Sequence, residues 1–414
     1  MKRYEIYKSS GIEWINTIPK DWIVMRVKDL FYVINGSTPN SGNEILWDGD
    51  ITWITPADMV DFGPISEGKR CITKEGYLSC GTSILPVGSI ILSSRAPIGK
   101  VNWSTRKLCT NQGCKSLVNR KQGNLYFYYL LFTLREILTS FGRGTTFMEL
   151  GTNDLKNIKL LVPPCQTQST IANYLDTKTA AIDRKIELHT TKADKYKALR
   201  RSLINETVCR GLNPDAALKD SGIEWIGKIP EHWEVKRVKE LFDISRGRVI
   251  GQQELIDDGK YPVYSSQTEN NGCLGYINTY DFNATLLTWT TDGANAGTVF
   301  KRTGKFNCTN VCGLLKSKRQ NHNLDFMLYV LQISASHNKR IDTNGAKIMS
   351  NEMSIIPLLF PPIKEQVTIA TYLDSKTAQF DTILTNIGEQ INKLTQLRKT
   401  LINDVVTGKI KVTE

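Results

Sequence analysis

The stretch Ser10-Gly11-Ile12-Glu13-Trp14-Ile15 occurs a second time, as Ser221-Gly222-Ile223-Glu224-Trp225-Ile226. Ile-Pro and Trp follow each copy at the same spacing, and from Ser10 to Phe31 15 of 22 positions are identical at an offset of 211 residues. A repeat of this length determines the architecture, because each copy has to build the same local structure. The chain is therefore an internal duplication.

A second duplicated block runs from Leu160 to Asp183 and returns from Leu358 to Asp381, with 15 of 24 positions identical at an offset of 198 residues. Between the two blocks the copies have diverged and share only short anchors, such as Cys109-Thr110-Asn111 and Cys308-Thr309-Asn310. A frame that is kept while its interior changes indicates one scaffold that presents two different binding faces.

Each copy of the second block is expected to open a long helix. Pro163-Pro164 cannot continue a helix but can precede one, and the pattern beyond it is helical to about Val208. In both copies a stripe of mostly apolar residues follows, with one residue every seven positions, and the two stripes coincide when the copies are aligned at the offset of 198. They are Leu175, Ile182, His189, Tyr196 and Leu203 in the first copy, and Leu373, Phe380, Ile387, Leu394 and Leu401 in the second. This periodicity predicts two amphipathic helices packed as an antiparallel coiled coil.

The predicted fold class is α+β, with two globular domains and two long helices. The domains are expected at residues 1–160 and, with a linker, at 211–357; the helices are expected at 161–210 and, with a tail, at 358–414. Strands are predicted at 82–92 and 284–289, and short helices at 125–132 and 324–331. Aromatic side chains in these regions are expected in the core rather than as stacking platforms for bases.

The composition is that of a folded protein with a basic surplus. In 414 residues, 53 Lys and Arg exceed 41 Asp and Glu, which gives a net charge of +12. Such a surplus suits a polyanionic partner, but it is spread along the chain and is also common in proteins that bind nothing charged. No apolar run is long enough to span a membrane and the N-terminal residues do not resemble a secretory signal, so a cytoplasmic location is expected.

The sequence contains none of the common motifs for catalysis or metal binding. Gly-x-x-x-x-Gly-Lys-Ser/Thr, Gly-x-Ser-x-Gly and His-Glu-x-x-His are all absent. The nine cysteines are scattered, and the closest pair, Cys308 and Cys312, has no second pair nearby to complete a zinc site. The four histidines give acid-base chemistry few candidates. We expect a non-catalytic protein with no metal, no cofactor and no catalytic residue of its own.

The duplicated motifs resemble those of the specificity subunits of type I restriction-modification systems. They are Gly-Ile-Glu-Trp-Ile, Ile-Pro and Trp before each variable region, and Pro-Pro, Gln, Ile-Ala and Tyr-Leu-Asp at the start of each long helix. The resemblance covers nearly the whole chain. It implies that each variable region is a target recognition domain that reads one half of a split site in double-stranded DNA. It also implies that the two helices hold these domains apart.

The same resemblance implies partners for the chain. The helices would dock two modification subunits, which bring S-adenosylmethionine and methylate adenine. Restriction subunits would bring ATP- and Mg-dependent translocation and cleavage, so these cofactors are expected on the partners alone. The helix positions assigned to partner binding are Leu175, Ile182, Tyr196, Leu203, Leu373, Phe380, Leu394 and Leu401.

Reading of bases needs polar side chains on loops, because Arg or Lys matches guanine and Asn or Gln matches adenine in the major groove. The candidates flank the shared anchors: Thr38, Arg95, Lys100, Asn111, Gln112, Arg143, Thr145 and Thr146 in the first domain, and Arg248, Asn295, Asn310 and Lys347 in the second. Each of them could instead contact phosphate, cap a turn or face water. Gly99 and Gly297 are interpreted as a shared backbone turn.

Two other functions are compatible with the sequence. The chain could be the recognition portion of a self-contained restriction-methylation enzyme, although the methylation motif Asn-Pro-Pro-Tyr is absent. It could also be a coiled-coil scaffold that does not bind DNA, which would show no salt-sensitive binding to nucleic acid.

Overall fold

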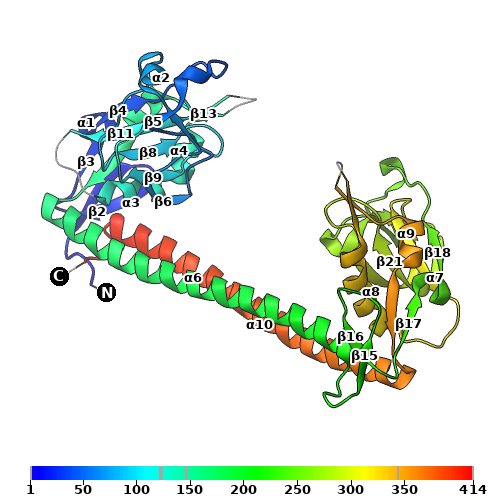
Figure 1. Cartoon of the computed structure of the whole chain (residues 1–414). Helices are drawn as coiled ribbons and strands as arrows, with labels where there is room; N and C mark the ends of the chain where they lie inside the picture. The colour runs from blue at the N-terminus through cyan, green and yellow to red at the C-terminus, as the bar shows by residue number, and fades with distance from the viewer. Residues whose placement is uncertain (1, 121–124, 145–147, 343–344, 413–414) are drawn as a thin grey trace. The chain divides into compact units, whose positions relative to one another are not determined.

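The computed structural model describes residues 2–120, 125–144, 148–342 and 345–412. The chain divides into two compact units, Met1–Thr190 with Glu389–Glu414 and Thr191–Gly388. Each unit contains one copy of the duplicated frame and a part of both long helices (Figure 1). The predicted α+β class and the duplicated organisation are confirmed.

The first unit is built around a five-stranded sheet of order β4-β11-β8-β9-β6, beside a three-stranded sheet of order β10-β5-β7. Its elements are β1 (Tyr7–Ile12), β2 (Ile15–Pro19), β3 (Ile23–Arg26), α1 (Val27–Leu30), β4 (Phe31–Asn35), η1 (Glu44–Leu46), β5 (Trp47–Ile54), β6 (Phe62–Ile65), β7 (Arg70–Ile72), α2 (Lys74–Leu78), β8 (Ile90–Ser93), β9 (Val101–Ser104), β10 (Cys109–Thr110), β11 (Cys114–Asn119), α3 (Tyr126–Thr133), α4 (Arg135–Ser140), β12 (Gly142–Arg143), β13 (Glu149–Leu150), α5 (Thr152–Asn157) and β14 (Lys159–Val162).

The second unit is built around a six-stranded sheet of order β18-β23-β21-β22-β19-β20. Its elements are β15 (Leu218–Asp220), β16 (Lys228–Pro230), β17 (Glu234–Arg237), α7 (Val238–Leu241), β18 (Phe242–Arg246), η2 (Gln252–Glu254), β19 (Tyr261–Tyr264), η3 (Glu269–Gly272), β20 (Cys273–Ile277), β21 (Phe282–Thr290), β22 (Val299–Cys308), β23 (Cys312–Ser317), α8 (Leu324–Asn338), β24 (Arg340–Asp342), β25 (Gly345–Lys347), α9 (Ser350–Ile355) and β26 (Pro357–Phe360).

One predicted strand is much shorter than expected. Only the last part of 82–92 forms a strand, as β8, because Pro86 and the left-handed Gly88 (φ 83°) turn the chain before it. The strand predicted at 284–289 lies inside β21. The helix predicted at 125–132 is found one residue later as α3, and the one predicted at 324–331 forms the first part of α8, which continues to Asn338. Turn residues inside an apolar stretch therefore override its strand propensity.

The two duplicated blocks of each copy meet in space as a pair of antiparallel strands. In the first unit β3 pairs with β14, with Arg26 opposite Lys159. In the second unit β17 pairs with β26, with Arg237 opposite Pro357. Each variable region therefore leaves and re-enters the frame through two neighbouring strands.

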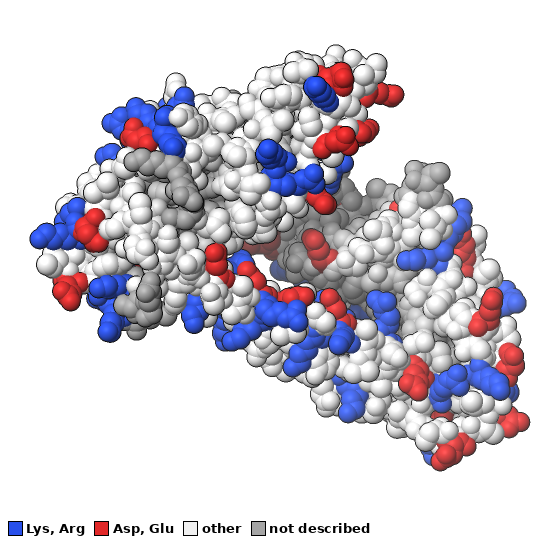
Figure 2. Space-filling view, turned by 60° about the vertical axis from the view of Figure 1, so that its left-hand side comes forward, with Lys and Arg blue, Asp and Glu red and all other residues white. Residues whose placement is uncertain are grey.

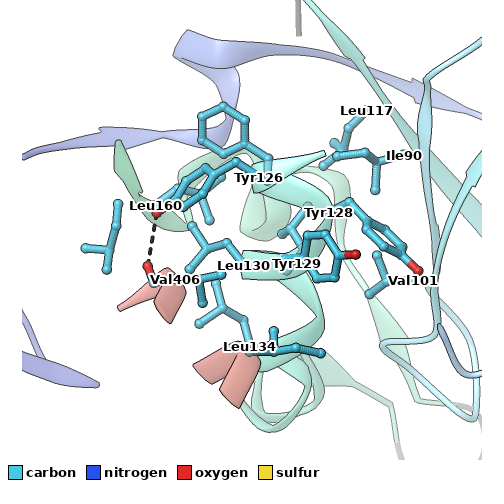
Figure 3. Close-up of a cluster of buried hydrophobic side chains, with 14 of the residues drawn as sticks. Ile90, Val101, Leu117, Tyr126, Tyr128, Tyr129, Leu130, Leu134, Leu160 and Val406 are labelled. Carbon is cyan, nitrogen blue, oxygen red and sulfur yellow. Dashed lines mark hydrogen bonds between the residues drawn. The ribbon is translucent and has the colours of Figure 1, made fainter. Parts of the chain in front are cut away.

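Aromatic side chains fill the core of each unit, as predicted. In the first unit four consecutive rings of α3, Tyr126 to Tyr129, are buried, and Figure 3 shows three of them among Ile90, Val101 and Leu117. The Tyr126 hydroxyl donates a hydrogen bond to the Val406 carbonyl at 3.0 Å. Burying a large apolar side chain contributes about 1.5–3 kcal/mol, so this run stabilises the attachment of α3 to the frame.

The long helices α6 (Cys165–Arg210) and α10 (Ile363–Val406) follow the two proline pairs directly. At each start a glutamine amide, of Gln168 or Gln366, donates to the carbonyl of the first proline of the pair, at 2.8 and 2.7 Å. Left-handed glycines, Gly211 (φ 74°) and Gly408 (φ 73°), follow each helix where the chain has to turn away. In the described stretches no helix is both long and apolar enough to cross a membrane.

The two helices form an antiparallel coiled coil held by a duplicated ion pair. In the first unit Arg398 of α10 pairs with Asp183 of α6, and in the second unit Arg200 of α6 pairs with Asp381 of α10 at 3.5 Å. The offset of 198 converts one pair into the other, with the two helices exchanged. Residue numbers fall along α10 as they rise along α6, which is the antiparallel direction predicted from the sequence.

Candidate nucleic-acid interface

Three of the predicted residues of the first unit come together beyond β4 and β10. The Thr38 hydroxyl donates to the side-chain oxygen of Gln112, and Asn111 Oδ1 accepts a hydrogen bond from the backbone N–H of Gly113 at 3.0 Å. The two backbone segments are in close contact, because a Cβ on Gly36 would lie 2.0 Å from the Asn111 carbonyl oxygen. Asn111 therefore holds its own turn, and this turn presents the exposed Gln112.

Arg95 lies on the exposed loop after β8 and pairs with Glu149 of β13, Nε to Oε2, at 2.9 Å. The buried Lys115 reaches the other oxygen of that carboxylate at 3.4 Å. Burial raises the pKa of Glu149, but the two cations outweigh this effect and hold the pKa below its ordinary value. The Arg95 side chain is 47% exposed, and exposed ion pairs are worth at most about 1 kcal/mol, so this guanidinium can exchange its partner at little cost.

The other candidates of the first unit differ in where their side chains point. Arg143 of β12 is exposed and pairs with Asp154 of α5 at 3.0 Å. Lys100 turns inward, and its Nζ donates to the carbonyls of Pro56 at 3.1 Å and Met59 at 2.8 Å, so it closes the loop after β5. The predicted residues 145 and 146 lie outside the described part of the chain.

In the second unit Arg248 lies beside Thr309 of the duplicated Cys-Thr-Asn anchor. Its guanidinium bridges Glu254 at 2.8 Å and Asp281 at 3.1 Å, and the hydrogen bond from Glu254 raises the pKa of Arg248. The preceding Gly247 repeats the close approach of the first unit, because a Cβ there would lie 2.0 Å from the Cys308 carbonyl oxygen. The two units therefore share a close approach of two backbone segments beside this anchor.

The remaining predicted residues of the second unit border the same loops. Asn295 Nδ2 donates to the Thr268 hydroxyl at 3.1 Å, and Asn310 is exposed directly after β22. Lys347 lies in β25, which bridges to Asp292 through the backbone. The shared turn predicted at the two glycines is confirmed, with φ values of 88° at Gly99 and 85° at Gly297. Which of the candidates contact bases stays a prediction.

A set of polar residues that sequence reasoning missed lies beside them. Asn270 and Asn271 form an exposed turn between β19 and β20, and Arg302 of β22 is buried beneath it. The tripeptide Asn270-Asn271-Gly272 is a turn signal that could have found this site. The role of Arg302 could not be inferred from the sequence, because nothing local distinguishes a buried arginine from an exposed one in a strand.

The eight stripe residues assigned to partner binding lie inward or in the seam between the helices. Leu175, Leu373, Phe380 and Leu401 are buried, and the Tyr196 and Phe380 rings meet edge to face at 6.2 Å. These stripe residues pack the two helices against each other. Other positions of the helices are exposed. Each unit has one exposed leucine of a duplicated pair outside the stripe: Leu199 in the second unit and Leu397 in the first are 55% and 54% exposed and are related by the offset of 198.

On the face drawn in Figure 2 the described Lys and Arg side chains do not form a single basic patch. In the view of Figure 2, Lys and Arg side chains alternate with Asp and Glu over the recognition regions and the helices. Among the described residues no group of three or more His, Cys, Asp or Glu could hold a metal ion.

Comparison with known proteins identifies related chains. A family model described as the type I restriction modification DNA specificity domain matches residues 19–195 and 230–393. The specificity subunit of the type I restriction enzyme MjaIX of Methanocaldococcus jannaschii is 34% identical over 256 residues, which are 60% of this chain and 58% of that protein. The match thus spans less than two thirds of that relative. A putative type I specificity subunit of Mycoplasma pneumoniae is 34% identical over 246 residues, which are 59% of this chain and 90% of that protein.

Solved structures share the fold over nearly the whole length. A chain from work on complex assembly and conformational transition of the type I R-M system aligns with a TM-score of 0.73 and 14% identity, over 95% of this chain and 99% of that one. The HsdS subunit from Thermoanaerobacter tengcongensis aligns with a TM-score of 0.50 and 14% identity, over 95% and 98%. At 14% sequence identity, these alignments show that the fold is shared.

Proposed function

Because this chain belongs to the family of type I restriction-modification DNA specificity subunits, we propose that it directs a DNA-methylating complex to a split site, one half of which is read by each unit. The observation that carries the proposal is a shared frame with different reading loops. Arg95 lies opposite Glu149 and pairs with it in the first unit, whereas Asp292 lies opposite Lys347 at the matching backbone bridge of the second. The two half-sites should therefore differ, and the whole site should be asymmetric.

Exposed ion pairs on the reading loops support this proposal. The guanidinium groups of Arg95, Arg143 and Arg248 are each held by carboxylates on partly exposed surfaces. Breaking such a pair costs at most about 1 kcal/mol, whereas a bidentate contact to a guanine contributes about 1–3 kcal/mol of discrimination. The free protein thus keeps these side chains in place, and a matching base can displace their carboxylate partners.

The duplicated exposed leucines of the long helices support docking of two modification subunits. In the second unit Leu199 lines a groove of about 320 Å³ with Tyr372, Phe380 and Ile383. Leu397 stands at the equivalent position in the first unit. Exposed apolar patches rimmed by polar residues are typical of protein interfaces. Each modification subunit would meet the same surface once, and would bring S-adenosylmethionine; ATP and Mg would come with restriction subunits.

The proposal is tested by reading the methylated motif. The chain is coexpressed with its modification subunit, and adenine methylation is mapped across the host genome. We expect a bipartite asymmetric motif. Arg95→Ala should relax one base position in one half by roughly 5- to 150-fold and leave the other half unchanged. Equal loss in both halves would contradict separate reading by the two units. The absence of methylation together with the absence of salt-sensitive DNA binding would favour a scaffold.

A further inference from the structure

The turn between β19 and β20 carries two exposed amide side chains on an unusual backbone. Asn270 (φ 48°, ψ 38°), Asn271 (φ 55°, ψ 33°) and Gly272 (φ 78°) are all left-handed. A Cβ is disfavoured in this region and glycine is not, although asparagine tolerates it better than most residues. Glycine at 270 and 271 would give the same turn with less strain. A role for the two side chains beyond the turn itself would explain their presence.

A buried arginine supports this turn from below. Arg302 is 2% exposed, and its Nη1 donates to the Asn271 carbonyl at 2.7 Å. The guanidinium lies between the rings of Tyr264, at 3.6 Å, and Phe300, at 4.3 Å. Among the described residues Arg302 forms no ion pair with a carboxylate, and burial lowers the pKa of Arg302. Burying a charge without a counter-charge is costly, so this turn is held in place at the expense of stability.

Gly272 makes the contact between the turn and Arg302 possible. A Cβ on Gly272 would lie 2.8 Å from Arg302 Nη2, and its φ also favours glycine. The backbone N–H of Ser265 closes the turn by donating to the Gly272 carbonyl at 3.0 Å. The Asn270 and Asn271 side chains are therefore displayed on a rigid backbone rather than on a loose loop.

The turn lies against residues already placed at the candidate interface. Thr268, directly before it, accepts the hydrogen bond of Asn295 at 3.1 Å. Ser265 meets the hydroxyl of Thr309, which precedes the exposed Asn310, at 3.0 Å. Among the described residues of the first unit, only Asp48 (φ 60°) has a left-handed backbone without being glycine, so this device belongs to one copy of the duplication.

We propose that Asn270 and Asn271 are specificity-determining residues that read adenine in the half-site of the second unit, and that Arg302 positions them. This inference rests on the proposed function. An asparagine amide can donate to adenine N7 and accept from adenine N6 at once, a pattern that no other base pair offers in the major groove. A backbone that is already held in place reduces the freedom that these side chains lose when they bind.

The test replaces both asparagines by glycine in the full chain with its modification subunit. Asn270→Gly with Asn271→Gly removes the amides and keeps the left-handed backbone, so folding should be unaffected or improved. Genome-wide methylation should show an adenine position of one half becoming degenerate, with roughly a 5- to 150-fold loss of discrimination. The other half serves as the internal control. Asp48→Gly, which relieves strain of the same kind in the first unit, should leave the adenine of the second half intact.

The outcomes separate this inference from the proposed function. If the unmodified complex methylates no bipartite motif, the proposed function fails. If it methylates such a motif and the double glycine variant methylates the same motif at the same rate, the asparagines only form a turn and this inference fails. Arg302→Lys keeps the charge but loses the planar guanidinium, and it should weaken discrimination at the same base position without changing the other half.

Discussion

At the scale of single residues, a tyrosine hydroxyl ties each recognition region to its long helix. In the first unit Tyr129 donates to Asp176 at 2.6 Å and lies 3.3 Å from Thr179. In the second unit Tyr329 makes the same contacts with Asp374 at 2.8 Å and Thr377 at 3.3 Å. The variable region and the frame thus share one hydrogen-bonded group in each copy.

Tyr329→Phe should loosen this attachment in the second unit alone. A hydrogen bond to a charged acceptor contributes about 1.5–3 kcal/mol, and its loss leaves Asp374 short of a donor. Hydrogen exchange of the full chain should show reduced protection in α10 around Asp374, with unchanged protection around Asp176, where the first unit provides the matched control. Equal loss in both helices would contradict a local role.

The same tyrosine predicts how stability depends on alkaline pH. Burial raises the pKa of Tyr329 from 10.0 to about 12. The folded state therefore keeps the proton that the unfolded state releases first, so this contribution to stability is complete below pH 10 and is lost as pH rises from 10 towards 12. Urea unfolding between pH 9 and 12 should show this loss, and Tyr329→Phe should make the pH dependence less steep. A variant as steep as the unmodified protein would contradict the assignment.

The conformations of some single residues could be predicted from the sequence, and those of others could not. Gly99 and Gly297 could be predicted because their neighbours recur in both copies. The inward path of Lys100 could not, because its two carbonyl partners belong to a loop more than forty residues earlier. A backbone dihedral such as that of Asn270 depends on contacts with Arg302, thirty-two positions later.

At the scale of elements, the long helices were the most predictable part of the molecule. Their starts follow proline pairs, and one stripe phase continues through both copies, so the information is local. The sheets were not predictable, because β10 pairs with β5 and β11 with β8 through contacts distant in sequence. The seam itself revealed a polar feature that periodicity does not contain, the duplicated ion pair.

Reversing one of these ion pairs tests the register of the helices. Asp183→Arg or Arg398→Asp alone should lower the free energy of unfolding by up to about 1 kcal/mol, because like charges then meet on a partly exposed seam. The double exchange should recover most of the loss in urea unfolding of the full chain. The Arg200 and Asp381 pair, left intact, is the matched control. Additive losses in the double variant would contradict direct contact between Asp183 and Arg398.

At the scale of the whole molecule, the duplicated exposed leucines predict the stoichiometry of the complex. Leu199→Asp should remove one of two modification subunits, because it places a charge in one copy of an apolar docking surface. Native mass spectrometry of the coexpressed complex should then detect one bound subunit in place of two. Leu188→Asp is the control, because Leu188 is 54% exposed but its counterpart is the polar Asn386. Loss of both subunits, or of neither, would contradict two equivalent docking positions.

The paired strands that close each variable region bear on how such regions can be exchanged during evolution. Because β3 and β14, and likewise β17 and β26, lie side by side, the two ends of each variable region are separated by only about 5 Å. We expect that a foreign region with ends of the same spacing can be grafted there if it also supplies the tyrosine contact to the long helix. The duplicated stretches on either side, with 15 of 22 and 15 of 24 positions identical, also offer crossover points for recombination between the two halves of the gene. If each variable region reads one half-site as proposed, exchange of a whole region should change the target sequence in one step.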